Sequence, residues 1–452
     1  MDVAAKRLSK EKPDKARLIA ARAITEVVFE GAFIGEAVNR HLTLSELSPE
    51  QRAFSTALVF GTITYWQTLT YYLEKVSHER LDTMSKYVQA VLALGVFQLF
   101  YADSVPAYAA VDTTVELAAY FEGKKVRPLA NALLRQLARE RPELPKRAPG
   151  LAYGWSNELF GVVRASYGEA VAEKIAAFST TFQKETSVRL NRKRVPSELP
   201  DGSLDRQIDV TAGRFVEAAR RLLLKGRSPL EQPAFRDGLM SLQNESSQLA
   251  VTLALQHKPQ HILDLCAGNG GKTAALREGA ASDVAITAVE IDPLKVQRNK
   301  ENLERLGLSD VRLLTGDATE SIPELADSSF DLVFCDVPCS GFGVLHKKPE
   351  IRLRMNYERI VELTLLQKAI LQRAATYVRP GGHLFYVTCT HNRMENEEQI
   401  DAFLSANDSF AAEPFVSLPS ELECGADAGR LNLFAYDHGV DGLFIQSMRR
   451  LR

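Results

Sequence analysis

The stretch Phe330–Gly343, FDLVFCDVPCSGFG, decides how the second half of the chain is interpreted. It begins as an apolar run typical of a buried strand and continues into Asp336, Pro338, Cys339 and two glycines. Pro338 lacks a backbone donor, and glycines let the chain turn close to a bulky group. A strand that ends in an acid and a thiol points polar groups into a crevice, so we expect an active-site rim with Cys339 as a reactive thiol. A buried cysteine beside an ordinary turn is the alternative.

Short apolar or β-branched runs recur after Ser247, each followed by a turn and usually by a helical pattern. They are His261–Leu265, Val284–Glu290, Val311–Thr315, Asp331–Asp336 and His383–Thr388. Repeated βα units of this length predict a mostly parallel, doubly wound sheet with ligands at the carboxyl ends of its strands. The last two strands should be neighbours, which would bring Asp336, Cys339 and Cys389 into one crevice.

A glycine-rich loop follows the first of these strands. It reads CAGNGGK, from Cys266 to Lys272, and its glycines would let backbone amides approach a ligand at a helix N-terminus. The spacing is not that of a Walker loop, and a plain tight turn is the alternative. Glu290, Asp317 and Asp336 place acids at the ends of three further strands. Three carboxylates around a glycine loop suit a cationic nucleoside better than a pyrophosphate, which predicts S-adenosylmethionine.

Two thiols beside a methyl donor predict a particular chemistry. C5 of a pyrimidine is a poor nucleophile until a group adds at C6, and a thiolate is a soft nucleophile able to add there. Cys339 and Cys389 are the two candidates for this addition.

The first part of the chain shows helical periodicity throughout and predicts an all-α bundle over residues 1–142. Ser48-Pro49-Glu50 has the composition of a helix start. The helices expected after it are Val59–Lys75, Met84–Tyr101, Tyr108–Phe121 and Val126–Arg139. The proline-rich Arg141–Gly150 cannot continue a helix and marks a domain boundary.

Residues 150–240 give a weaker pattern and predict a small mixed α/β domain. We expect helices over Asn157–Tyr167 and Ala170–Phe178, a strand over Thr186–Asn191 and a loop over Val195–Gly202. The remaining residues, 241–452, form the domain with the parallel sheet.

Composition places the chain among ordinary globular proteins. Its 452 residues suggest two or three domains, and its net charge of -2 gives no whole-chain argument for nucleic acid. RNA binding would need local basic runs, for which Lys6–Arg22, Arg189–Arg194 and Arg214–Arg227 are candidates, although each is also typical of a solvated face.

Neither a metal, a disulfide framework nor a membrane segment is expected. The five cysteines are odd in number and include no CxxC or zinc-like spacing. No apolar targeting segment follows Met1, and the most apolar run, Val88–Tyr101, is too short to span a bilayer and predicts a buried helix. We therefore expect a cytoplasmic protein.

Several motifs together resemble known RNA-modifying enzymes. DVPCSGFG, the TCT at Thr388–Thr390 and the GGKT loop resemble the RNA 5-methylcytosine methyltransferases. RPLANALLRQL at Arg127–Leu137 resembles a NusB-like RNA-binding domain. With LQNESSQLA at 242–250 and DGLFIQSM at 441–448, nearly the whole chain resembles the bacterial 16S rRNA methyltransferase B family. The resemblance implies a Rossmann-like class I methyltransferase domain that uses S-adenosylmethionine to methylate C5 of a cytidine in 16S rRNA.

The resemblance also implies residue roles. Cys389 would attack C6 of the cytidine, Asp336 would contact the ring near N3, and Cys339 would assist release of the adduct. The cofactor would be held by Cys266, Ala267, Gly268, Asn269, Gly270, Gly271, Lys272, Glu290, Asp317 and Asp336. Arg189 and Asn191 are candidate RNA contacts, and the target base would be unstacked or flipped out.

The chain departs from the family pattern at three places. Gly268-Asn269 replaces an Ala-Pro pair, Val337 replaces alanine, and HNRMENE at His391–Glu397 replaces a proline-bearing segment. A methyltransferase for tRNA or for a protein side chain and a non-catalytic RNA-binding assembly factor are the alternatives. A pure binding module has no need of two thiols at adjacent strand ends, and the NusB-like part favours rRNA. A monomer is expected, but the sequence leaves the oligomeric state and the modified nucleotide open.

Overall fold

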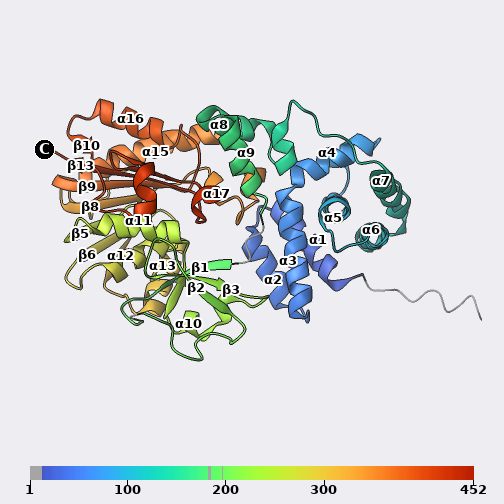
Figure 1. The fold of residues 1–452 in the computed structure, drawn as a ribbon, viewed down its shortest axis with the longest axis horizontal. Coiled ribbons are helices and arrows are strands. Elements are labelled where there is room, and N and C mark those ends of the chain that lie inside the picture. Colours follow the sequence, from blue (N-terminus) through green and yellow to red (C-terminus); the bar gives the residue numbers. More distant parts are fainter. Residues whose placement is uncertain (1–12, 182–184, 196) are drawn as a thin grey trace, which may run out of the picture. The chain divides into compact units, whose positions relative to one another are not determined.

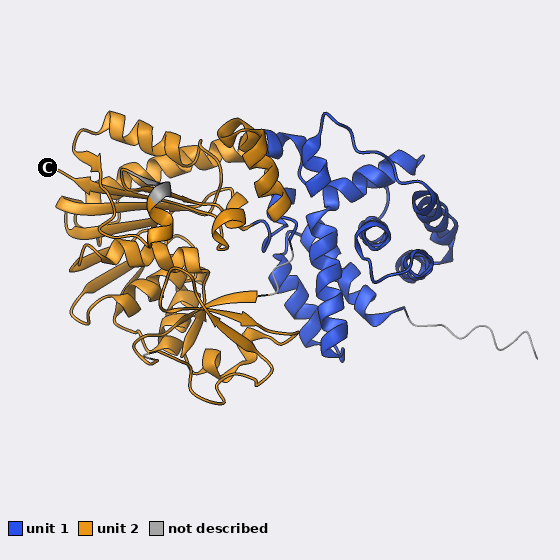
Figure 2. Ribbon diagram, viewed as in Figure 1, with its two compact units in different colours: residues 1–161, 179–182, 345–354 blue, residues 162–178, 183–344, 355–452 orange. Residues whose placement is uncertain are grey.

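A computed structural model describes residues 13–181, 185–195 and 197–452. The chain forms two compact units (Figure 2). Unit 1 comprises residues 1–161, 179–182 and 345–354, and unit 2 comprises residues 162–178, 183–344 and 355–452. The division into three domains stays a prediction.

Unit 1 is a helical bundle, as predicted (Figure 1). Its helices are α1 (Lys15–Phe29), α2 (Ile34–Thr43), α3 (Pro49–Thr64), α4 (Trp66–Val76), α5 (Lys86–Tyr101), α6 (Ala107–Glu122) and α7 (Arg127–Arg139), with short 3-10 turns η2 (Leu81–Thr83), η3 (Lys124–Val126) and η4 (Pro149–Tyr153). The expected start of α3 is confirmed, because Ser48 and Gln51 form a capping box and Pro49 occupies the first helical position. α14 (Ile351–Arg354) belongs to the returning segment 345–354 of this unit.

The continuous helix predicted over Val59–Lys75 is wrong, because the chain breaks at Tyr65 between α3 and α4. The carbonyl of Thr64 accepts a hydrogen bond from Arg352 Nη1 at 2.7 Å. Gly154 packs so closely on the same carbonyl that a Cβ there would lie 1.9 Å from its oxygen. The helix therefore ends where distant residues cover its last carbonyl, which periodicity along the chain does not reveal.

The predicted buried helix is α5, whose central residues from Ala90 to Gln98 are all buried. It lies in the apolar core of unit 1, against residues of α1, α3, α4, α6 and α7. Among the residues that the structure describes, no helix is long and apolar enough to cross a membrane.

Two helices and a small sheet follow the bundle in the chain. α8 (Asn157–Tyr167) and α9 (Glu169–Phe178) match the predicted helices. The sheet in unit 2 is antiparallel with the order β2-β3-β1-β4. Its strands and adjacent turns are β1 (Glu185–Leu190), β2 (Asp209–Ala212), β3 (Ala219–Leu223), η5 (Pro229–Glu231), α10 (Pro233–Arg236) and β4 (Met240–Leu242).

The larger sheet of unit 2 has nine strands, in the order β11-β12-β13-β9-β8-β5-β6-β7, with β10 paired to β13. Figure 1 labels β13, β9, β8, β5 and β6 of this sheet. β5 to β9 run parallel, and the remaining strands are antiparallel. The strands are β5 (His261–Asp264), β6 (Ala285–Glu290), β7 (Val311–Thr315), β8 (Phe330–Asp336), β9 (Val378–Thr388), β10 (Phe410–Ala412), β11 (Ala426–Asp427), β12 (Arg430–Leu433) and β13 (Leu443–Arg450). The predicted doubly wound sheet is confirmed, although β9 begins five residues before the expected His383, with an irregular register beside β8.

Helices cover both faces of this sheet. Alternate residues of β8 point to opposite sides: Val333 lies in a core with α15, and Leu332 lies in a core with α11 and α12. The helices of this region are α11 (Glu245–Leu255), α12 (Gly271–Gly279), α13 (Pro293–Leu306), α15 (Tyr357–Tyr377), α16 (Glu397–Ala406) and α17 (Ala435–His438), with 3-10 turns η6 (Phe342–Val344) and η7 (Ser420–Gly425). Strand order reverses at β5, between β6 and β8, and the carboxyl end of β5 is therefore where a doubly wound sheet binds its ligand.

Candidate active site

The carboxyl ends of the parallel strands carry the polar residues of the site. β5, β6 and β8 end at Asp264, Glu290 and Asp336. β8 and β9 are parallel neighbours, with Asp336 opposite Val387, so Cys389 follows directly at the next strand end. The sequence-based expectation that these two strands are adjacent is confirmed.

Glu290 holds the glycine-rich loop by its side chain. One carboxylate oxygen accepts from the backbone N–H of Gly268 at 2.9 Å, and the other accepts from that of Asp292 at 3.1 Å. The backbone carbonyl of Glu290 also accepts from Gly316 N at 3.1 Å, which brings the start of the Asp317 turn to the same place. Asp317 itself closes that turn by accepting hydrogen bonds from the backbone N–H and hydroxyl of Thr319.

Gly270 is the position in this loop that only glycine fits. Its φ of +82° is left-handed, and a Cβ there would lie 2.0 Å from Asn299 Oδ1 on α13. The loop therefore enters α12 with its backbone pressed against a neighbouring side chain. The Asn299 oxygen is buried and has no hydrogen-bond partner among the described residues.

Asp264 is a site residue that the sequence reasoning did not select. It is fully buried, and one of its oxygens accepts from the Thr273 hydroxyl at 2.6 Å. Its other oxygen has no partner in the described part of the chain. Burial is the main cause that raises the pKa of Asp264 to about 7. A carboxyl group at the end of a strand that precedes a glycine loop was the available signal.

Lys272 links the loop to the carboxyl end of β8. Its Nζ lies 2.5 Å from Asp336 Oδ2. Burial lowers the pKa of Lys272, but the charge and hydrogen bond of Asp336 outweigh that effect, so the pKa is raised and the ammonium form is favoured. Its charge also interacts with Cys389. Lys272, predicted only as a cofactor residue, therefore pairs with Asp336 and lies within electrostatic range of Cys389.

The two thiols lie together. Cys339 Sγ is 3.4 Å from Cys389 Sγ, and both residues are partly exposed. The hydrogen bond with Cys389, followed by burial, raises the pKa of Cys339. Cys335, in contrast, is buried in the sheet core, and burial raises its pKa as well. Cys266 lies beside the same core as a partly buried residue.

Residues after Cys389 hold the Cys339 loop in place, and the sequence reasoning missed them. Ser340 and Thr390 share a hydrogen bond of 2.6 Å between their hydroxyls, and Glu395 accepts from the backbone N–H of Ser340 at 2.9 Å. The segment HNRMENE, noted only as a departure from the family pattern, supplies Glu395. Polar residues directly after a strand end were the signal that could have selected it.

Arg189 and Asn191, the candidate RNA contacts, are buried, so that prediction is wrong. Arg189 forms a two-bond ion pair with Glu278 of α12, at 2.8 and 2.9 Å, and donates to the carbonyl of Gly271 at 3.1 Å. Asn191 donates to the carbonyls of Gly238 and Leu306. These side chains join β1 and its following turn to α12 and to the end of α13 instead of facing solvent.

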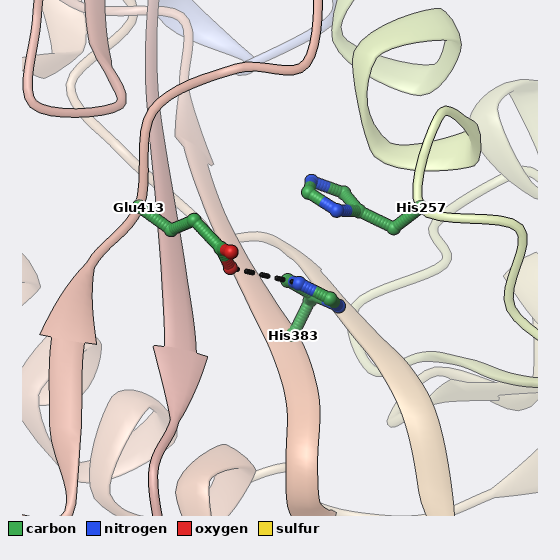
Figure 3. Close-up of side chains that lie close together, drawn as sticks. All are labelled: His257, His383 and Glu413. Carbon is green, nitrogen blue, oxygen red and sulfur yellow. Dashed lines mark ion pairs between the residues drawn. The ribbon is translucent and has the colours of Figure 1, made fainter.

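A separate cluster contains two histidines and an acid (Figure 3). His383 Nε2 lies 2.8 Å from Glu413 Oε2, and the rings of His257 and His383 stack with centroids 3.8 Å apart. Burial, and then His383, lower the pKa of His257 to about 4. Two imidazoles on one tetrahedral ion, with metal–nitrogen bonds of about 2.0–2.1 Å, keep their ring centres roughly 5 Å apart. The stacked rings would have to separate before both could bind one ion.

Comparison with known proteins gives consistent results for both parts of the chain. Residues 14–139 match the NusB family, and residues 250–449 match the family described as 16S rRNA methyltransferase RsmB/F. A probable ribosomal RNA small subunit methyltransferase B from Bacillus subtilis is 31% identical and covers 97% of this chain and 99% of its own. A protein with the same description from Synechocystis is 29% identical, over 96% and 99% of the two chains. The solved structure of PH0851 covers 97% of this chain and 99% of its own with a TM-score of 0.80 and 22% identity, which supports the fold.

Proposed function

The chain belongs to the RsmB/F family of rRNA methyltransferases, and on that premise we propose that it methylates C5 of a cytidine in 16S rRNA through a covalent bond between Cys389 and C6 of the base. The observation that carries this proposal is a pair of partly exposed cysteines at adjacent strand ends, with their sulfurs 3.4 Å apart. Methyl transfer to oxygen or to an exocyclic nitrogen has no need of two such thiols.

S-adenosylmethionine is the cofactor of this methyltransferase family. The residues present fit it: the loop from Gly268 to Lys272 has no room for a side chain at Gly270, and Glu290 and Asp264 place carboxyl groups beside that loop. The unpaired oxygen of Asp264 leaves an acceptor for a polar group of the ligand. When bound, the cofactor supplies an electrophilic methyl group.

The first step falls to Cys389. Its sulfur would form a bond to C6, and the electron pair of the C5–C6 double bond would make C5 nucleophilic. Lys272 lies near enough to Cys389 to favour negative charge there, and it holds the Asp336 carboxyl group at the end of the neighbouring strand. Asp336 would then contact the ring near N3 and orient the base.

Cys339 would serve the second step. After the methyl group is on C5, the C5 proton must leave, the double bond must form again and the bond between Cys389 and C6 must break. Cys339, next to Cys389, is the candidate acceptor of that proton.

Substitution of each cysteine tests these roles. Cys389→Ala should abolish methyl transfer, whereas Cys339→Ala should accumulate a covalent adduct of protein and RNA that survives a denaturing gel with radiolabelled RNA. Cys335→Ala, on β8 four residues before Cys339, is the matched control, since its buried thiol should be dispensable for chemistry. Turnover by Cys389→Ala, or the absence of an adduct with Cys339→Ala, would refute the assignment.

Bisulfite mapping of RNA from cells that lack the protein tests the substrate. We expect one cytidine of 16S rRNA to lose its C5 methyl group. Loss of a tRNA modification instead would change the substrate class, and unchanged methylation of all RNA would favour a role in binding alone.

A further inference from the structure

Glu395 is a buried carboxylate beside the two thiols, with an exposed fraction of 0%. Its four hydrogen-bond donors are all neutral. One oxygen accepts from Ser340 N and Gln367 Nε2, each at 2.9 Å, and the other accepts from the Ser340 hydroxyl and from Asn392 Nδ2 at 3.0 Å. Removing a carboxylate from water costs free energy, so the buried Glu395 lowers the stability of the fold unless its hydrogen bonds compensate.

The donors come from three separate segments of unit 2. Ser340 follows Cys339 directly, Gln367 lies on α15, and Asn392 follows Cys389 by three residues. Glu395 is therefore the common acceptor for the loop of one thiol, the segment after the other thiol and a helix that covers the sheet.

A second set of bonds fixes the residues on both sides of Cys339. Gln367 Nε2 also donates to the carbonyl of Pro338 at 2.8 Å, while the Ser340 hydroxyl bonds to Thr390 at 2.6 Å. Pro338 and Ser340 flank Cys339, and Thr390 follows Cys389. The network thus holds the backbone on both sides of Cys339 and joins it to the segment after Cys389.

We infer that Glu395 is a positioning residue that holds Cys339 in place for release of the covalent adduct. This inference rests on the proposed role of Cys339 and adds a residue that touches neither the base nor the cofactor. A carboxylate side chain has only hydrogen-bond acceptors and no donor, so it can accept from all four of these donors. A glutamine would turn an NH2 group toward donors, which leaves at least one bond unmade. Burial raises the pKa of Glu395, consistent with a site that has little solvent access.

The test uses the full chain with Glu395→Gln, compared with Glu398→Gln, an exposed glutamate on α16. Formation of the Cys389–RNA adduct in a single turnover should be nearly unchanged. Adduct should persist on a denaturing gel, and steady-state turnover should fall roughly tenfold, the scale of one lost hydrogen bond to a charged group. A residue that served folding alone would lower adduct formation and turnover together.

Several outcomes overturn the inference. Turnover equal to that of Glu398→Gln would do so, and so would a parallel loss of adduct formation and turnover in a folded Glu395→Gln protein. If Glu395→Gln does not fold, Ser340→Ala is the second variant. It removes the hydroxyl that donates to Glu395 and bonds to Thr390, and it should show the same persistent adduct. Normal turnover by the Ser340→Ala protein would overturn the inference.

The cysteine variants separate this inference from the proposed function. If Cys339→Ala accumulates adduct and Glu395→Gln does not, only the inference fails. If Cys339→Ala accumulates none, the proposed role of Cys339 fails and the inference fails with it.

Discussion

Substitution of Arg189 by alanine should destabilise unit 2 and leave RNA affinity almost unchanged. The side chains of Arg189 and Glu278 are 5% and 4% exposed, and their ion pair has two short hydrogen bonds. Removal of one partner from a buried pair costs about 3–5 kcal/mol, because the other charge stays buried without compensation. Lys193 and Arg305 also interact with Glu278, so we expect a loss near the lower end, about 3 kcal/mol.

The assay is urea unfolding followed by far-ultraviolet circular dichroism. Tryptophan fluorescence is a poorer probe, since the two tryptophans, Trp66 and Trp155, both belong to unit 1. Arg192→Ala is the control: it pairs with Glu217, whose side chain is 83% exposed, and should cost less than about 1 kcal/mol. Replacing both members of the buried pair by methionine should restore most of the stability, because no charge is then buried.

RNA binding at several salt concentrations distinguishes the buried role from the surface role that the sequence suggested. Each phosphate contact contributes about 0.7 to 0.9 to the slope of log affinity against log salt. Arg189→Ala should leave that slope unchanged. A lower slope together with a stability loss under about 1 kcal/mol would refute the buried role.

Three further changes have defined consequences. Gly270→Ala should weaken S-adenosylmethionine binding at least tenfold by calorimetry, because the new Cβ meets Asn299 in a left-handed turn. The pKa of His257 is lowered to about 4, so the contribution of His257 to the free energy of unfolding should be complete above pH 6.5 and lost as the pH falls toward 4. Because the ring is half-buried, this loss should be about 1–2 kcal/mol. His257→Leu should therefore flatten the pH dependence of the free energy of unfolding. Arg352→Met should destabilise unit 1 by about 1–3 kcal/mol in fluorescence-monitored unfolding, since it strips the buried Thr64 carbonyl of its donor. Normal stability would contradict this.

Local pattern was sufficient for the fold class and for the strand ends. The apolar runs before Asp336 and Cys389 predicted two strands, and the βα alternation placed them side by side, which the pairing of β8 and β9 confirms. Hydrophobic periodicity reports which side of an element is buried, and it needs only residues a few positions apart. The capping box at Ser48 is local in the same sense.

The sequence predicted the roles of charged and polar residues less well, because the partners of these residues are distant in the chain. Arg189 lies in a basic run, yet it pairs with Glu278, 89 residues away. A cation on the surface and a cation in a buried ion pair look the same in the sequence, and only the fold supplies the acid.

The sequence by itself determined a helical part, a doubly wound sheet and two cysteines after adjacent strands. The tertiary structure alone decided that the sulfurs lie 3.4 Å apart, that Lys272 faces Asp336, that Glu395 binds the loops of both thiols, and that Arg352 ends α3. The physical reason is the distance along the chain between the groups involved. Which side of a helix or strand is buried follows from side chains a few positions apart, whereas hydrogen bonds and ion pairs join groups that only the folded chain brings together.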